Sequence, residues 1–179
     1  MYYDNQREWK RIASQVSTGT AVQSPFTFYN AINNDWSATH NYDYWNIHLP
    51  STDNTVIKTI YDPGISGFVT PKSNSYNNFT TNSDYTTNSS QFNVVGNFAK
   101  GWYFYSNTSA GKIFFHALGI RDTEGDDGKL VGVNSRCYYW AAGTDQSNRA
   151  ACLGFSTSHM SPIGRNIKSS GFIYRPVLE

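Results

Sequence analysis

Residues 171–177, GFIYRPV, are the stretch that most directly indicates how this chain folds. The pair Ser170-Gly171 is typical of a turn, and the aromatic and β-branched residues that follow it are typical of a strand. We therefore expect Phe172 and Val177, together with Trp140 from an earlier strand, to pack in the core. We therefore expect the fold to depend on residues 171–177, which complete its core.

The composition favours a strand-rich protein. Aromatic residues make up 16% of the 179 residues, and Asn, Ser and Thr dominate the polar ones. Asn and Ser compete with helical backbone hydrogen bonds, whereas aromatic rings fit the pleated surface of a sheet. The same mixture is typical of recognition surfaces, in which Tyr lies among Ser, Gly and Asn. The length suits one domain with a sizeable core.

The charge content excludes two classes of partner. The formal net charge is +1, and only 15% of the residues are charged. A nucleic-acid-binding domain or a protein that lies on an anionic membrane carries a basic patch, which this balance does not indicate. No apolar run is long enough to cross a bilayer, and no signal peptide is apparent. We expect no nucleic-acid partner and no direct membrane insertion.

The two cysteines do not form a recognisable framework. Cys137 and Cys152 lie 15 positions apart, and we interpret them as two unpaired thiols rather than a disulfide. Neither the cysteines nor the four histidines show the spacing of a zinc site, and no CxxC or HExxH motif occurs. The sequence therefore predicts no metal and no cofactor.

Hydrophobic spacing predicts one helix near the beginning and short strands after it. Trp9, Ile12, Ala13 and Val16 recur at helical spacing, which predicts a helix over residues 5–16 that ends at residues 17–20. One further helical turn is expected to bury Tyr76 and Phe79. The expected strands lie within residues 24–32, 55–61, 92–107, 111–120, 137–143, 150–157 and 171–177. Residues 33–46 are interpreted as a loop that is dense in aromatic side chains.

Candidate catalytic chemistry is sparse. An acidic run contains Asp122, Glu124, Asp126 and Asp127, but it departs from the calcium-loop pattern, so we interpret it as a solvated turn. No G-x-S-x-G elbow occurs, and most aspartates stand in turn contexts, where they hydrogen-bond to the local backbone. We predict no catalytic residues and no enzymatic activity.

A series of motifs resembles a known family. In chain order the motifs are VQSPFTFY, YDYWN, KTIYDPGISGFVTP, FAKGWYFY, GKIFFHALGIRD, GKLVGVN, YYWAA, LGF, SP and GFIYRPVLE. They resemble the domain that closes many gut-bacterial surface and pilus-tip-like proteins, sometimes called the major paralogous domain. The resemblance covers residues 22–179, with residues 1–21 as a separate helical segment of the same single domain.

The resemblance implies a fold and a mode of use. The family is similar to C-type lectin-like domains, including formylglycine-generating-like domains and the variable proteins of diversity-generating retroelements. It therefore implies an α+β, C-type lectin-like fold, with short helices early and a mainly antiparallel, strand- and loop-rich C-terminal part. In the variable proteins the C-terminal strands and loops carry the diversified ligand-binding surface.

The chain departs from the family pattern at several positions. Gly64 stands where a cysteine is frequent after Asp-Pro, and Lys168 stands where arginine is usual. The calcium-ligating EPN and WND motifs of animal lectins are missing. Unusual residues gather between residues 135 and 167, which is the pattern that targeted diversification leaves: Arg136, Cys137, Arg149, Cys152, His159 and Arg165.

Together these observations predict a non-enzymatic binding domain on an extracellular, cell or virion surface, with a protein or glycan ligand on another cell or host. Oligomerisation is left open. The predicted contact residues are Ser135, Arg136, Tyr138, Thr144, Asp145, Arg149, Ser158, His159, Arg165 and Asn166. Tyr138 is expected to be an aromatic anchor and the arginines to be forked donors. The alternatives are a structural subunit of a pilus or phage-tail-like assembly, and a formylglycine-generating-like enzyme that uses the two cysteines.

Overall fold

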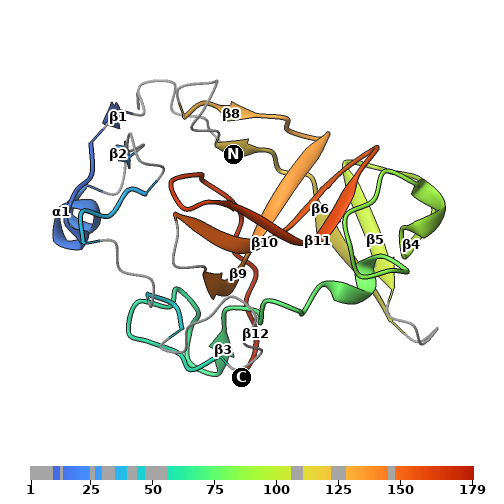
Figure 1. Cartoon of the computed structure of the whole chain (residues 1–179), viewed down its shortest axis with the longest axis horizontal. Coiled ribbons are helices and arrows are strands. Elements are labelled where there is room, and N and C mark those ends of the chain that lie inside the picture. Colours follow the sequence, from blue (N-terminus) through green and yellow to red (C-terminus); the bar gives the residue numbers. More distant parts are fainter. Residues whose placement is uncertain are drawn as a thin grey trace.

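The structure is a computed structural model of the chain. It describes residues 10–12, 14–24, 27–29, 35–39, 44–46, 56–105, 111–121, 128–144 and 148–179. The N-terminal elements lie on one side of the molecule, a three-stranded sheet crosses its middle, and a second three-stranded sheet lies on the opposite side (Figure 1).

The central sheet contains the longest strands. It runs in the order β11 (Met160–Ile167), β10 (Arg149–Ser156) and β9 (Arg136–Thr144), and all its pairings are antiparallel. Alternate residues of β9 and β10 face opposite sides, as the period of a strand requires. One side carries Tyr139, Leu153 and Phe155, which are at most 3% exposed. That side is the floor of the main core.

The second sheet covers this floor. It consists of β4 (Val94–Val95), β5 (Gly101–Tyr105) and β6 (Lys112–His116), again antiparallel. Phe104 of β5 is fully buried and stacks on Phe79 with ring centroids 4.0 Å apart. The 3₁₀ turn η1 (Asn77–Phe79) supplies that ring, and Tyr76 beside it is 4% exposed. The predicted helical turn is confirmed as a 3₁₀ turn, with Tyr76 buried and Phe79 half-buried against the core.

Residues 171–178 close the molecule by joining three separate elements. The short strands β7 (Ile120–Arg121) and β8 (Leu130–Val131) pair with each other, and Arg121 bridges to Gly171. Ile173 bridges to Tyr139 of β9, and β12 (Val177–Leu178) pairs with β3 (Phe68–Val69). The segment is therefore an extended tie rather than one continuous strand.

The N-terminal part differs from its prediction. Residues 10–12 form β1 (Lys10–Ile12), which pairs in parallel with β2 (Thr27–Tyr29), so the helix predicted over residues 5–16 is wrong in the described part. The only α-helix among the described residues is α1 (Thr18–Gln23). It begins where the predicted helix was expected to end, because the Ser17 hydroxyl accepts the Thr20 N–H and caps the helix N-terminus.

The predicted fold class is wrong. Apart from this six-residue helix and two 3₁₀ turns, the second being η2 (Ser89–Gln91), the regular elements of the described residues are strands in small, mostly antiparallel sheets. This is not the predicted α+β fold with short helices early. Pairing with distant strands overrode the helical spacing of the first residues.

The strand predictions met a mixed outcome. The strands expected within 24–32, 111–120, 137–143 and 150–157 are confirmed, whereas residues 92–107 form two paired strands, β4 and β5, in place of the one expected. Residues 56–61 form no strand, and β11 was not predicted, because Pro162 and Gly164 interrupt its pattern. Such residues are tolerated at an edge strand, which β11 is. Trp140 is buried and Phe172 packs on it, but Val177 is 40% exposed, so its core placement is wrong.

Candidate functional site

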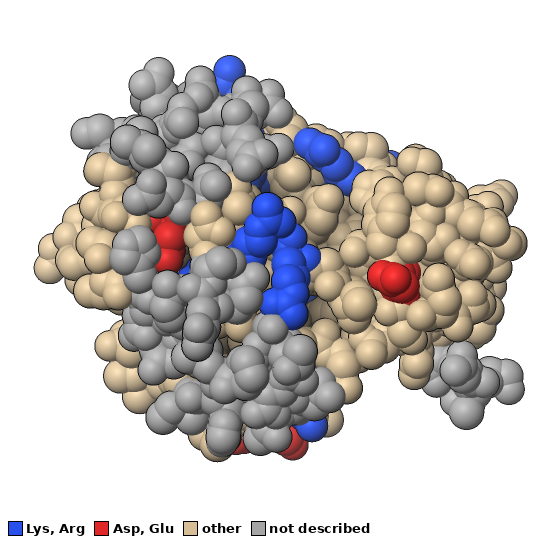
Figure 2. Space-filling model, in the orientation of Figure 1, with Lys and Arg blue, Asp and Glu red and all other residues tan. Residues whose placement is uncertain are grey.

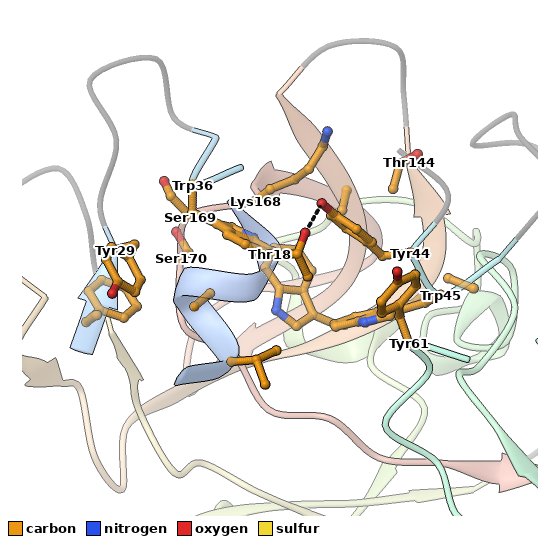
Figure 3. Close-up of a pocket in the computed structure, with 17 residues that line it drawn as sticks. Thr18, Tyr29, Trp36, Tyr44, Trp45, Tyr61, Thr144, Lys168, Ser169 and Ser170 are labelled. Atoms are coloured by element: carbon orange, nitrogen blue, oxygen red, sulfur yellow. Dashed lines mark hydrogen bonds between the residues drawn. The ribbon is translucent and has the colours of Figure 1, made fainter. Parts of the chain in front are cut away.

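An aromatic cavity lies beside the central sheet, where the N-terminal elements approach it. Its volume is about 450 Å³, and its walls come from α1, β2, the segments around residues 36, 44 and 61, and residues 168–170. The end of β9 and the beginning of β10 form the floor (Figure 3). The aromatic side chains that line it are Phe28, Tyr29, Trp36, Tyr44, Trp45, Tyr61 and Trp140.

Small side chains on the sheet leave this space open. Ala142 and Ala150 line the cavity and are 5% and 8% exposed, and Thr144 lies opposite Ala150 in the strand register. Trp140 lines the cavity beside them and packs on Phe172, with ring centroids 4.3 Å apart. Methyl side chains cannot fill the distance to the aromatic rings on the other side. The hollow therefore follows from small residues facing large ones.

The aromatic walls are supported by contacts with one another. The ring of Trp36 stacks on that of Tyr44 with centroids 5.7 Å apart and an angle of 18°, and Tyr61 meets Tyr44 edge-on at 5.5 Å. Trp45 meets Tyr174 edge-on at 6.1 Å, outside the cavity. Such pairs hold large rings in preferred geometries. The walls are therefore built before any ligand enters.

A group of hydroxyls surrounds the Tyr44 hydroxyl. The Tyr44 oxygen lies 2.7 Å from Thr18 Oγ1, which α1 supplies, and 3.0 Å from Ser37 Oγ (Figure 3 shows the first contact). Thr39 Oγ1 is a third neighbour at 3.3 Å. Burial acts to raise the pKa of Tyr44, but donation from these hydroxyls outweighs it, so the pKa is lowered. These contacts tie α1 to the loop that carries the aromatic wall.

A basic and hydroxyl-bearing edge completes the cavity. Lys168 lines it and contacts the buried Asp35, with Nζ 3.5 Å from Oδ2. The other Asp35 oxygen, Oδ1, accepts the backbone N–H of Ser37. Ser169 also lines the cavity, is 3% exposed, and its hydroxyl has no hydrogen-bond partner in the structure. The edge therefore carries an ion pair and, beside it, a buried hydroxyl without a partner.

Four of the predicted contact residues lie near this cavity. Thr144 lines it, and Asn166 lies opposite Ala150 on the other side of β10. Arg149 precedes Ala150, and Arg165 lies opposite Ala151; both arginines are exposed. Figure 2 shows Lys and Arg side chains gathered in a stripe across the middle of the visible face.

Four others lie at the opposite end of the same sheet. Arg136 pairs with Ser156, and the turn after Ser156 carries Ser158 and His159. Ser135 precedes Arg136 and is exposed. At roughly 3.3 Å per residue, the length of β10 separates this group from the first by roughly 23 Å. The structure therefore brings the predicted residues together as two groups and not as one face.

The turn at this far end is held by local hydrogen bonds. Ser156 Oγ lies 2.7 Å from His159 Nδ1 and accepts the backbone N–H groups of Ser158 and His159. Burial, and then the charge of Arg136, lowers the pKa of His159. The hydroxyl is thus occupied by the turn that contains it.

The remaining two predicted residues have other outcomes. Tyr138 is half-buried, and its ring stacks on Phe172 with centroids 4.7 Å apart. A Cβ on Gly154 would meet the Tyr138 ring at 2.4 Å, so this ring lies flat against the sheet. The ring packs on Phe172 and part of the side chain stays exposed, so its role as an anchor remains a prediction. Asp145 lies outside the described residues, as does the acidic run at 122–127.

Sequence reasoning missed the aromatic walls. It placed Trp36, Tyr44 and Trp45 in a loop and Tyr61 in a strand, without a role for any of them. The available signal was the density of aromatics among Asn and Asp, because large apolar rings in a polar loop need something to cover them. The residues around these aromatics do not indicate which end of the central sheet the rings would face.

The two cysteines are free, buried thiols, as predicted. Cys137 belongs to the main core, whereas Cys152 packs with Trp140 on the other side of the sheet. Thiols on opposite faces of a sheet do not have the geometry of a disulfide. Burial raises the pKa of Cys137 to about 11 and that of Cys152 to about 12, so both stay protonated near neutral pH.

Comparison with known proteins identifies no relative. No family model, curated protein or solved structure matches the chain. Within the described residues, no three or more His, Cys, Asp and Glu side chains gather as a metal site would require. None of the described helices has the length and apolar character needed to span a bilayer.

Proposed function

We propose that this protein is a ligand-binding domain and that the aromatic cavity is its binding site. The observation that carries the proposal is the cavity itself: about 450 Å³, mostly apolar, and walled by aromatic rings. Pockets for small molecules have this size and lining, with a few polar groups that set orientation. Lys168 and Thr144 are such groups here.

The supported contacts of the walls favour binding over a packing defect. A defect collapses when its walls are free to move, whereas Trp36, Tyr44 and Tyr61 hold one another and Tyr44 is tied to α1. A preformed apolar site loses little conformational entropy on binding.

The experiment is saturation-transfer NMR with 2-methylnaphthalene as the probe. The wild-type chain is expected to bind it, and Ala150→Leu is expected to abolish binding because the larger side chain fills the floor. Ala99→Leu, at an exposed loop position, is the matched control and should bind as wild type does. The proposal fails if the wild-type chain does not bind the probe, or if a folded Ala150→Leu variant binds it unchanged.

The sequence resemblance suggests where the protein acts. We propose display on a cell or virion surface, with residues 135–166 as a diversified region; the motif series alone supports this. The gene offers a direct test. A nearby copy of the coding stretch for these residues that differs only at adenines, beside a reverse transcriptase, is the expected finding. A locus without such a copy would contradict diversification but not ligand binding.

A second candidate function, as a subunit of an assembly, is favoured by exposed apolar side chains. Ile60 and Ile65 are 91% and 72% exposed, and Leu178 of β12 is 76% exposed. Residues of this kind at a surface often mark protein interfaces. Light scattering distinguishes the two functions: a concentration-dependent oligomer that Ile60→Asp dissociates supports assembly, and a monomer at all concentrations contradicts it.

A further inference from the structure

We infer that the cavity takes the hydrocarbon end of an amphipathic molecule, and that the polar end of this molecule stays in water at the mouth of the cavity. The inference rests on the proposed function and adds the chemical class of the ligand. A cavity of about 450 Å³ with mostly apolar walls is large enough to enclose a hydrocarbon group. Each methylene that leaves water contributes to binding without needing a hydrogen-bond partner.

The hydroxyls around Tyr44 are already hydrogen-bonded to one another. The Tyr44 oxygen lies 2.7 Å from Thr18 Oγ1 and 3.0 Å from Ser37 Oγ, and Figure 3 shows the first contact on the cavity wall. The Ser169 hydroxyl is buried within the wall and is not reached from the cavity. A polar ligand group beside these walls would therefore lose hydrogen bonds to water without gaining others, which is unfavourable.

The charge at the edge of the cavity is also used within the protein. Lys168 Nζ lies 3.5 Å from Asp35 Oδ2, and Asp35 is 2% exposed. A ligand carboxylate that took Lys168 from this pair would leave a buried carboxylate without its cation, which is strongly unfavourable. Thr144 likewise interacts with other parts of the protein. Lys168 and Thr144 therefore orient a ligand by keeping hydrocarbon away from their edge, and not by binding its polar group.

Two exposed wall residues mark where the cavity meets water. Val22 of α1 is 73% exposed and Tyr61 is 51% exposed, and both line the cavity. At the floor, Ala142 and Ala150 are 5% and 8% exposed. Because exposure falls from these walls to the floor, a ligand that enters past Val22 and Tyr61 leaves its outer end in water. Its hydrocarbon end then covers the alanines, and its polar end keeps its hydration at the mouth.

The experiment measures the affinity of matched alcohols by calorimetry and ligand-observed NMR. The probes are 1-butanol, 1-hexanol, 1-octanol and 1,8-octanediol. Affinity is expected to rise about 4-fold per methylene from butanol to octanol, the factor that one buried methylene supplies. The diol has the chain of 1-octanol but carries a second hydroxyl at the inner end. It should bind at least about 5-fold more weakly than 1-octanol, the smallest effect expected for a hydroxyl buried without a partner.

A second comparison changes only the polar end. Octanoate, 1-octanol and octylammonium should bind within about 5-fold of one another, because a group that stays in water interacts weakly with charges of the protein. Val22→Lys adds a positive charge at the mouth, so it should raise the ratio of octanoate to octylammonium affinity by at least about 2-fold. Ile113→Lys, at a position on β6 that is 42% exposed and does not line the cavity, is the matched control and should leave the ratio unchanged.

A floor variant locates the effect, and 2-methylnaphthalene separates the two proposals. Ala150→Leu fills the floor and should remove the dependence on chain length, whereas Ala99→Leu should keep it. The inference is overturned if affinity rises less than about 2-fold per methylene, or if the diol binds less than about 5-fold more weakly than 1-octanol. Polar ends that differ by more than about 5-fold in the wild-type chain, or an unchanged ratio in Val22→Lys, also overturn it. In each of these cases, binding of 2-methylnaphthalene leaves the cavity proposal intact. Failure of every probe, 2-methylnaphthalene included, overturns both.

Discussion

The two faces of the central sheet use the same kind of side chain in opposite ways. On the main-core face, Phe104 is fully buried, with Phe79, Phe115 and Phe155 around it at centroid distances of 4.0, 5.5 and 5.7 Å. On the other face, aromatic rings surround a hollow of about 450 Å³. One face is closed by its aromatics, and the other is held open by them.

The size of the facing residues explains the difference. In the core, the aromatic rings pack mainly against other aromatic rings, Leu153 and Met160, and they also cover Ala141 and Ala151. At the cavity the rings face Ala142 and Ala150, whose methyl groups reach only a short way. Aromatic content therefore does not by itself distinguish a core from a binding site. The size of the side chains that the rings face distinguishes them.

The largest expected effect concerns the closed face. Phe104→Ala should lower the free energy of unfolding by roughly 3–5 kcal/mol, since it leaves a void among rings that cannot collapse into it. Tyr61→Ala, at a cavity wall residue that is 51% exposed, should cost less than about 1 kcal/mol. Urea unfolding measures both. Similar losses at the two positions would show that the faces do not differ in packing.

A smaller loss is expected at Gly64, whose neighbour Tyr174 packs edge-on against the cavity-wall residue Trp45. A Cβ on Gly64 would meet the Tyr174 hydroxyl at 2.7 Å and the Phe68 carbonyl oxygen at 2.8 Å, so Gly64→Ala should cost roughly 1–3 kcal/mol. Nothing lies within 4 Å of the corresponding position at Gly111, which makes Gly111→Ala the matched control. Thermal unfolding compares the two variants. If Gly64→Ala is as stable as Gly111→Ala, the open face is less tightly supported than the structure indicates.

The helix at the cavity wall should respond to its cap. Ser17→Ala removes the hydroxyl that accepts the Thr20 N–H, which should cost roughly 0.5–2 kcal/mol and weaken 2-methylnaphthalene binding, since α1 lines the cavity. Ser14→Ala, at an exposed position outside the helix, is the control. Denaturant unfolding and NMR titration measure the two properties. Unchanged probe binding in a destabilised Ser17→Ala variant would mean that α1 is not needed as a wall.

The smallest effect is expected at the far end of the sheet. Because the pKa of His159 is lowered on folding, the unfolded chain takes up the proton more readily. The stabilising contribution is therefore present above about pH 6.5, the ordinary value for histidine, and is lost as the pH falls through the lowered value.

The measurement is the melting temperature at pH 7.5 and at pH 5.0. Wild type should lose more stability over this interval than His159→Gln, and probe binding should change equally little in both, because His159 does not line the cavity. Parallel curves for the two chains would remove His159 as the source of the pH dependence.

Part of the fold followed from local patterns and part did not. The apolar runs of β5, β6, β9 and β10 predicted strands because alternation is a local property. The sequence 5–16 carries helical spacing, yet residues 10–12 pair with β2, because a partner strand 17 positions away offers backbone hydrogen bonds that local spacing does not reveal. The edge strand β11 was not predicted, because it contains Pro162 and Gly164, which interrupt a strand pattern but are tolerated at the edge of a sheet.

The candidate site divides in the same way. Thr144, Arg149, Arg165 and Asn166 were singled out from the sequence, and they do lie at one end of the sheet because neighbouring antiparallel strands bring their ends together. The sequence also assigned Ser135, Arg136, Ser158 and His159 to that group. They lie at the other end of the sheet, because the two ends of β9, and likewise of β10, are a full strand length apart. The aromatic walls had no assigned role in the sequence.

By itself the sequence determined that this is a strand-rich chain with many aromatic residues and little charge, because these properties depend on composition and on neighbours a few residues apart. Only the tertiary structure decided which rings close a core and which surround a cavity. The reason is physical: the outcome depends on what stands across the gap, and Trp36 meets Ala150 only after more than a hundred residues have folded between them.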